Sequence, residues 1–275
     1  MRKVLTFFIC IMLTSAAFAE RFIDTIHSVS KGQEDQEHLV YLTNGRIFFF
    51  NSQSFSPDDF INGDRIEVEV DKNNRLLSVK SLPKTFAEEE GFDVFDNISE
   101  DATILSDYSE VSRIFNGMNR NYYNRTECTD RAHVWSYEEW KKYKLISRKV
   151  FMFFTSTYIR KYNYKWWFHV SPYTLVKENE MVTEYVMDRR FINTPLTMKA
   201  WSDVFIQSKK SCPVSTYAHY RANNYGPEHC FHVKSHMYNR LPLHVENEEN
   251  TGQSRSQFNS SEVNYSYRAF SRRSR

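Results

Sequence analysis

The sequence has 275 residues, with 36 basic and 34 acidic side chains and a formal net charge of +2. This near balance excludes the strongly basic surface of a nucleic-acid-binding domain and indicates no acidic partner. Aromatic residues make up 16% of the chain and glycines number only 7, which is typical of a well-packed globular protein rather than a repeat or low-complexity chain.

Residues 1–19 have the pattern of a secretory signal peptide. A basic start at residues 2–3 precedes an apolar run at 4–13, and Ala17 and Ala19 form a small-x-small cleavage site. The run is too short to span a membrane. We therefore expect cleavage after Ala19 and a protein that is secreted or periplasmic, with no membrane contact after cleavage.

Residues 20–82 predict a small, all-β, barrel-like N-terminal module. Asn44-Gly45 separates β-rich runs at 38–43 and 46–50, and this dipeptide is a strong hairpin signal. Residues 64–70 alternate apolar and charged side chains, as a half-buried strand does. The adjacent rings of Phe48, Phe49 and Phe50 suit either a core or a binding patch, and core packing is the more common role.

A linker follows at residues 83–108, with a proline at its start and an acidic run at 88–90. We also consider the N-terminal half a possible pro-region that covers a functional site in the second half of the chain until it is cut.

The second domain, residues 109–245, begins with a plausible helix at 109–116 and then a helical pattern that starts at Cys128. Trp135 and Trp140 belong to the apolar positions of this second helix, which leaves Cys128 at its N-terminus. Unpaired N–H groups and the positive end of the helix dipole favour a thiolate there. The position suits a nucleophile, and a buried structural cysteine is the competing interpretation.

Cleavage of the signal removes Cys10 and leaves three cysteines, an odd number in an oxidising compartment. Cys212 and Cys230 flank a polar loop, and a disulfide that closes a loop of this size contributes about 3 kcal/mol in the chain-entropy model. This pairing leaves Cys128 free. The alternative is a zinc site that adds His229, His232 and His236, but the spacing is irregular and an oxidising compartment favours the disulfide.

Three strands are expected next, at 149–157, 166–176 and 182–188, and then a helix at 196–206. Pro195 would take the first helical position, with Thr194 as N-cap. Residues 246–275 are polar with few aliphatic side chains, and we expect a disordered tail.

His169 lies within the second of these strands, and Asp188 ends the third. Because consecutive strands usually lie side by side, the two side chains are expected to be neighbours against the Cys128 helix. His169 would then take the thiol proton, and Asp188 would orient the imidazole. His133 is a rival base, but its five-residue spacing from Cys128 points it away. Alternation sends Trp166 and Trp167 to opposite faces, and either is a candidate to line the substrate pocket.

Three segments in this order resemble the bacterial protein-glutaminases: Cys128-Thr-Asp-Arg-Ala-His133, Trp167-Phe-His-Val-Ser-Pro172, and Val186-Met-Asp-Arg-Arg-Phe191, which is followed by Pro195 and Trp201. The resemblance covers residues 110–240. It implies an α+β fold with a papain/transglutaminase-like core, a Cys–His–Asp triad, protein substrates with exposed glutamine, and no metal or organic cofactor. One departure is Arg189, where the family often has proline.

The resemblance implies deamidation of glutamine side chains through a thioester. The same triad also serves transglutaminases and cysteine proteases, and a secreted binding protein without activity is the alternative of another class. The triad alone does not distinguish these outcomes, since the shape of the pocket decides which group reacts and with what.

Overall fold

The computed structural model describes residues 19–32, 34, 36–82, 102–120, 126–208, 210 and 212–271. The expected signal peptide, apart from Ala19, and the first part of the expected linker, residues 83–101, lie outside the described residues. None of the described helices has the length and apolar character needed to cross a bilayer.

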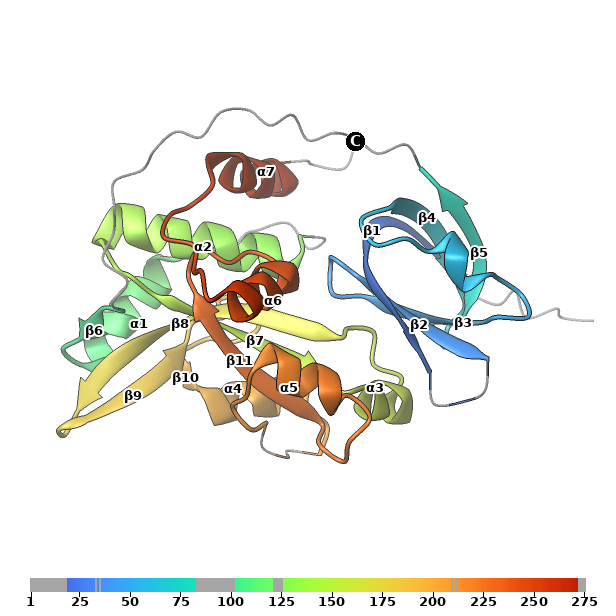
Figure 1. Ribbon diagram of the computed structural model, residues 1–275. Helices are drawn as coiled ribbons and strands as arrows, with labels where there is room; N and C mark the ends of the chain where they lie inside the picture. The colour runs from blue at the N-terminus through green and yellow to red at the C-terminus, as the bar shows by residue number, and fades with distance from the viewer. Residues whose placement is uncertain are drawn as a thin grey trace, which may run out of the picture.

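The N-terminal module is a five-stranded antiparallel sheet (Figure 1). Its strands are β1 (Glu20–Lys31), β2 (Glu37–Leu42), β3 (Ile47–Asn51), β4 (Arg65–Val70) and β5 (Leu76–Ser81), in the order β3-β2-β1-β4-β5, with a short 3₁₀ helix η1 at Pro57–Asp59. The expected Asn44-Gly45 hairpin is confirmed, with Gly45 at φ 90°. One isolated bridge, Phe49 to Arg75, joins the two edge strands.

Strands β2 and β3 are apolar on both faces, which explains the run of three phenylalanines. Phe48 and Phe50 point into the core of the module, together with Val40 and Leu42. On the opposite face Phe49 joins the core of the second domain, with Leu39, Tyr41 and Ile47. The preference for core packing over a binding patch is thus confirmed, and one face of the hairpin is buried against the second domain.

The second domain contains a six-stranded sheet with the path β10-β9-β8-β7-β11, and β6 pairs in parallel with β8. The strands are β6 (Ile104–Leu105), β7 (Arg148–Phe154), β8 (Phe168–Glu178), β9 (Met181–Val186), β10 (Leu196–Thr197) and β11 (Cys230–His236). The three expected strands are present, each with shifted ends. Residues 104–105 were expected to be linker. They form strand β6 instead, because they pair in parallel with Leu175 and Val176 of β8.

Seven α-helices surround this sheet in the described part of the chain: α1 (Tyr108–Gly117), α2 (Cys128–Tyr143), α3 (Ser156–Tyr162), α4 (Met198–Phe205), α5 (Tyr217–Ala222), α6 (Pro242–Thr251) and α7 (Ser260–Ser271). Helix α2 lies across the sheet, and α7 lies on its outer side (Figure 1). The mixed α+β class is confirmed. The expected N-cap Thr194 is wrong: residues 196–197 pair with β9 before α4 begins, so Thr197 caps the helix and accepts from the N–H of Ala200.

The C-terminal stretch expected to be a disordered tail instead contains α6 and α7. Two anchors account for the difference. Phe258 and Val263 form a small core with Tyr238, against the outer face of α2. The hydroxyl of Ser266 donates to Asp130 in the first turn of α2, at 2.9 Å. A few buried contacts thus order a segment whose composition is polar.

Candidate active site

The nucleophile candidate lies at the first turn of α2. Cys128 is the first residue of the helix, as expected, and it is buried and free of a disulfide. Glu127 precedes it in an extended conformation, and its side chain makes no capping hydrogen bond. The helix dipole and the N–H groups of this uncapped first turn therefore favour negative charge at the sulfur and at a group bound beside it.

His169 and Asp188 meet beside Cys128, because β8 carries the first and the turn after β9 carries the second. Strands β8 and β9 are antiparallel neighbours. Nε2 of His169 lies 2.6 Å from Oδ2 of Asp188, and each side chain is only 1% exposed. The indole N–H of Trp201 on α4 donates to the same oxygen at 3.0 Å. The carboxylate is held from two sides and fixes the orientation of the imidazole.

The charge state of His169 reflects this setting. Burial alone lowers its pKa, but the charge of Asp188, the hydrogen bond with that carboxylate and the hydrogen bond with Cys128 raise it to about 9. Because Nε2 is engaged by Asp188, Nδ1 is the ring nitrogen that remains for the sulfur. The three predicted residues therefore meet, with an imidazole that favours its protonated form beside a thiol.

A cavity of about 320 Å³ opens onto this cluster, and it is lined by Cys128 and His169 among others. Trp166 lies in its wall and stacks on the His169 ring, with centroids 6.0 Å apart. Phe191 presents its edge to the same imidazole at 5.2 Å. Trp166 is thus at the pocket, as one of the two expected tryptophans.

Trp167, the second expected pocket residue, is not in the cavity wall. It is 1% exposed and packs on the other side of the strand, where its indole N–H donates to the carbonyl of Leu42 at 2.9 Å. Its ring stacks on Phe153 of β7. The pocket assignment of Trp167 is therefore wrong, since this residue, just before β8, points toward the N-terminal module.

The N-terminal module contributes to the same cavity. Asn44 and Arg46, on either side of the hairpin turn, line it together with Cys128. The carbonyl of Gly45 accepts from the backbone N–H of Trp167 at 2.7 Å, and Arg46 forms a β-bridge with Trp166. The hairpin tip is hydrogen-bonded to the strand that carries His169.

Two carboxyl groups near this contact are shifted toward their neutral forms. Burial raises the pKa of Glu127 well above its ordinary value, and the charges of Asp24 and Asp130 raise it further. Burial also raises the pKa of Asp24, in the module, to about 6. Glu127 of the second domain and Asp24 of the N-terminal module are thus both held toward their neutral forms where the two parts of the protein meet.

The remaining sequence predictions are settled by their contacts. His133 is fully buried, and its Nδ1 lies 3.0 Å from Nζ of Lys149, so it faces away from the cavity. Cys212 and Cys230 form the expected disulfide. The zinc alternative is wrong because both sulfurs are bonded to each other, and His232 pairs with Ser202 at 2.7 Å instead.

Several site residues were not foreseen as such: Asn44, Arg131, Phe191 and, as a partner of Asp188, Trp201. A signal existed for Arg131, since a residue three positions after Cys128 on a helix shares its face. Phe191 lies in the turn that follows Asp188, which brings its ring against His169. Asn44 and Trp201 arrive through contacts between separate segments, which local patterns do not reveal.

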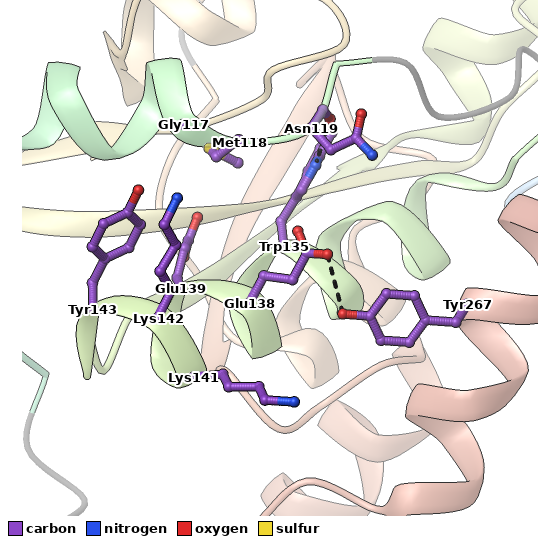
Figure 2. A pocket seen from close by; sticks show the side chains of 10 residues that line it. All are labelled: Gly117, Met118, Asn119, Trp135, Glu138, Glu139, Lys141, Lys142, Tyr143 and Tyr267. Atoms are coloured by element: carbon purple, nitrogen blue, oxygen red, sulfur yellow. Dashed lines mark hydrogen bonds between the residues drawn. The ribbon is translucent and has the colours of Figure 1, made fainter.

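A second cavity, of about 390 Å³, lies along the far half of α2 (Figure 2). It is bordered by the end of α1 and by Tyr267 of α7, whose hydroxyl donates to Glu138 at 3.1 Å. None of the three predicted catalytic residues lines it. This second cavity is therefore separate from the candidate active site.

Residues 93–205 match a family model described as glutaminase. None of the curated proteins matches the chain in sequence. The crystal structure of a mutant pro-protein-glutaminase is 13% identical, with 81% of this chain and 85% of that chain covered and a TM-score of 0.50. That of pro-protein-glutaminase is 12% identical, with 81% and 84% covered and a TM-score of 0.48. The protein-glutaminase of Chryseobacterium proteolyticum is 14% identical, with 60% and 86% covered and a TM-score of 0.39. At 13% identity the likeness to the first of these structures is one of fold. Together with the family match over residues 93–205, it confirms the resemblance noted in the sequence.

Proposed function

We propose that this chain, whose residues 93–205 match the glutaminase family, is a cysteine hydrolase that deamidates glutamine side chains in proteins. The observation that supports this most directly is the 2.6 Å contact between His169 and Asp188, with Cys128 hydrogen-bonded to the same ring. Nucleophile, base and orienting acid are then within reach of one another, as acyl transfer requires.

In the proposed reaction the Cys128 thiolate attacks the side-chain carboxamide carbon of glutamine. The C–N bond breaks as the His169 imidazolium gives its proton to the departing nitrogen, and ammonia leaves a thioester behind. Water then attacks the thioester and loses a proton to His169, and the C–S bond breaks to give glutamate. The uncapped N–H groups at the start of α2 are suited to stabilise the oxyanion in both steps.

The N-terminal module is proposed to act as a pro-region. Its hairpin tip lies in the wall of the cavity with Cys128, and the adjacent strand face is buried in the core of the second domain. A protein substrate needs the space that Asn44 and Arg46 now border. Full activity should therefore require removal of the module, and a chain starting near Tyr108 should be more active than the full-length protein.

The same proposal includes a papain/transglutaminase-like arrangement of the second domain, a barrel-like closure of the module, and export through the signal peptide. A helix that presents its first-residue cysteine to an antiparallel sheet supports the first. The bridge between Phe49 and Arg75 supports the second. The disulfide between Cys212 and Cys230 supports the third, because disulfides persist in oxidising compartments.

The test is ammonia release from a glutamine-rich protein, read beside a denaturing gel and mass spectra of the substrate. The proposal expects ammonia and glutamine-to-glutamate conversion, without cleavage or cross-links. Cleavage would identify a protease and cross-links a transglutaminase. Cys128→Ala is the matched control: retained turnover would overturn the mechanism. A wild type that stays inert after the module has been removed, and whose Cys128 also resists alkylation, would instead favour a binding protein.

A further inference from the structure

Arg131 of α2 points a cationic side chain at the candidate active site. It follows Cys128 by three residues, which places both on one face of the helix. Its side chain lines the same cavity of about 320 Å³, although the residue is only 6% exposed. A guanidinium buried this deeply beside a nucleophile needs a physical reason, because burial of an unpaired charge is costly.

The contacts of Arg131 leave its charge largely uncompensated. One terminal nitrogen donates to the carbonyl of Thr126, and the guanidinium carbon lies 5.6 Å from the centre of the Phe191 ring. Its Nε has no hydrogen-bond partner in the described part of the chain. These partners are a neutral carbonyl and a ring, so neither brings a full negative charge.

The two carboxylates whose charges act on Arg131, Asp130 and Asp188, are already engaged. Asp130 accepts from Nε and one terminal nitrogen of Arg240, at 3.0 and 2.7 Å. Asp188 accepts from His169 and from Trp201. The anion that remains for Arg131 is the sulfur of Cys128. Burial lowers the pKa of Arg131, while the negative charges of Cys128 and Asp188 oppose that effect. A guanidinium stays protonated at any pH the protein meets.

We propose that Arg131 is the cation that stabilises the thiolate of Cys128 and so sets the pH at which the nucleophile becomes reactive. The inference rests on the proposed function only in taking Cys128 as the nucleophile. Arg131 thus supplies a permanent positive charge beside the sulfur. The imidazolium of His169 supplies a second one, but that charge is lost at high pH.

Other charged or titratable groups face the sulfur, and none replaces Arg131. Glu127 is held toward its neutral form, so it does not cancel the guanidinium charge. Arg190 lies in the cavity wall but is half-buried, where water weakens its effect. The other groups are His169 and Asp188 from the triad, Tyr164, and Arg46 from the N-terminal module. Asp24 of the module acts on Glu127.

The test measures the alkylation rate of Cys128 by iodoacetamide as a function of pH, in the full-length protein with its signal removed. The other two cysteines are joined in a disulfide, so the label reports one thiol, and Cys128→Ala verifies this. Arg131→Gln should move the midpoint of the profile up by about one pH unit, which is about a tenfold loss of rate on the acidic side. Arg131→Lys should leave the midpoint close to the wild-type value, because it keeps the charge.

Lys142→Gln is the matched control, since it removes a cation from the exposed far end of the same helix and should leave the profile unchanged. If Arg131→Gln does not show cooperative unfolding, and so is not properly folded, Arg131→Met is tested in its place. It also removes the charge but keeps an apolar side chain of similar length. A profile for the folded neutral variant that coincides with wild type would overturn the proposal. Alkylation needs no turnover, so a shifted profile in a protein that releases no ammonia even after the N-terminal module has been removed would refute the proposed function and leave Arg131's role standing.

Discussion

Asp188 holds Nε2 of His169 at 2.6 Å while Trp201 donates to the same carboxylate oxygen at 3.0 Å. This places the acid between the imidazole and the indole, with all three side chains buried. The ring of His169 consequently presents Nδ1 toward Cys128. The geometry makes the tautomer of His169 depend on Asp188, and several consequences can be measured.

Asp188→Asn should reduce the rate of ammonia release by about 10⁴-fold, because an amide in place of the acid favours the wrong tautomer of the imidazole. Trp201→Phe keeps the carboxylate and removes one donor to it, so its loss of rate should be smaller. Initial rates on one protein substrate, with thermal unfolding of each variant, check both. A folded Asp188→Asn variant with nearly wild-type turnover would contradict the orienting role.

The stability of the protein should fall as pH rises through the range where His169 loses its proton. Its folded-state pKa of about 9 lies above the ordinary value of 6.5, so the protonated form is stabilised by folding. This contribution is fully present below about pH 6.5 and is lost as pH rises through about 9, and its size is on the order of 3 kcal/mol.

Urea unfolding of wild type and His169→Gln over this pH range provides the measurement. Other buried groups titrate in both proteins, so the difference between the two stability curves isolates His169. The difference should shrink at alkaline pH. A constant difference from pH 6 to 10 would mean that the imidazole has no raised pKa.

The segment that connects β11 to α6 should contribute to the stability of the nucleophile helix through one buried ion pair. Arg240 binds Asp130 in the first turn of α2, and both side chains are largely shielded from water. Arg240→Met leaves the carboxylate without its cationic partner, with the Ser266 hydroxyl still donating to it, and should lower the free energy of unfolding by about 3–5 kcal/mol.

Lys199→Met is the comparison for that variant. It breaks the ion pair with Asp203 at 3.0 Å, in which the lysine is mostly exposed, and should cost less than about 1 kcal/mol. Denaturant unfolding at neutral pH measures both. Equal small losses would show that the pair with Asp130 does not hold α2.

The meeting of Cys128, His169 and Asp188 could be predicted because each rests on a local pattern. A helix start locates the cysteine, and two consecutive strands place the histidine and the acid side by side. The helices of the C-terminal segment could not be predicted in this way. Arg240, just before α6, pairs with Asp130, 110 residues earlier, and Ser266 of α7 donates to the same carboxylate, 136 residues earlier. A few such contacts order a stretch that its polar composition describes as disordered.

The presence of Asn44 in the cavity is unpredictable for the same reason. The dipeptide Asn44-Gly45 identifies a hairpin but not the surface on which the hairpin docks. That docking depends on the second apolar face of β2 and β3, where Phe49 enters the core of the other domain. In the sequence, the three adjacent phenylalanines are the sign that both faces of the hairpin are apolar. They do not tell whether the second face packs within the module or against another domain.

Gly45 allows a final prediction about the contact between the module and the active site. Its φ of 90° favours glycine, and a Cβ added there would lie 3.2 Å from the carbonyl oxygen of Phe168, next to His169. Gly63, in the same module, has a φ of 86° and no atom within 4 Å of such a Cβ. Alanine at either position meets the same kind of backbone strain, of about 1–2 kcal/mol, but only at Gly45 does it also press on β8.

If the docked hairpin restrains activity, Gly45→Ala should raise ammonia release by the uncut full-length protein several-fold over wild type, since the module is held less tightly. Gly63→Ala should leave that rate near the wild-type value, although both variants lose stability within the module. After the module has been removed by cleavage in the segment before Tyr108, all three proteins should be equally active, because the remaining domain is then identical. A full-length Gly45→Ala protein no more active than Gly63→Ala would indicate that the hairpin does not limit access to Cys128.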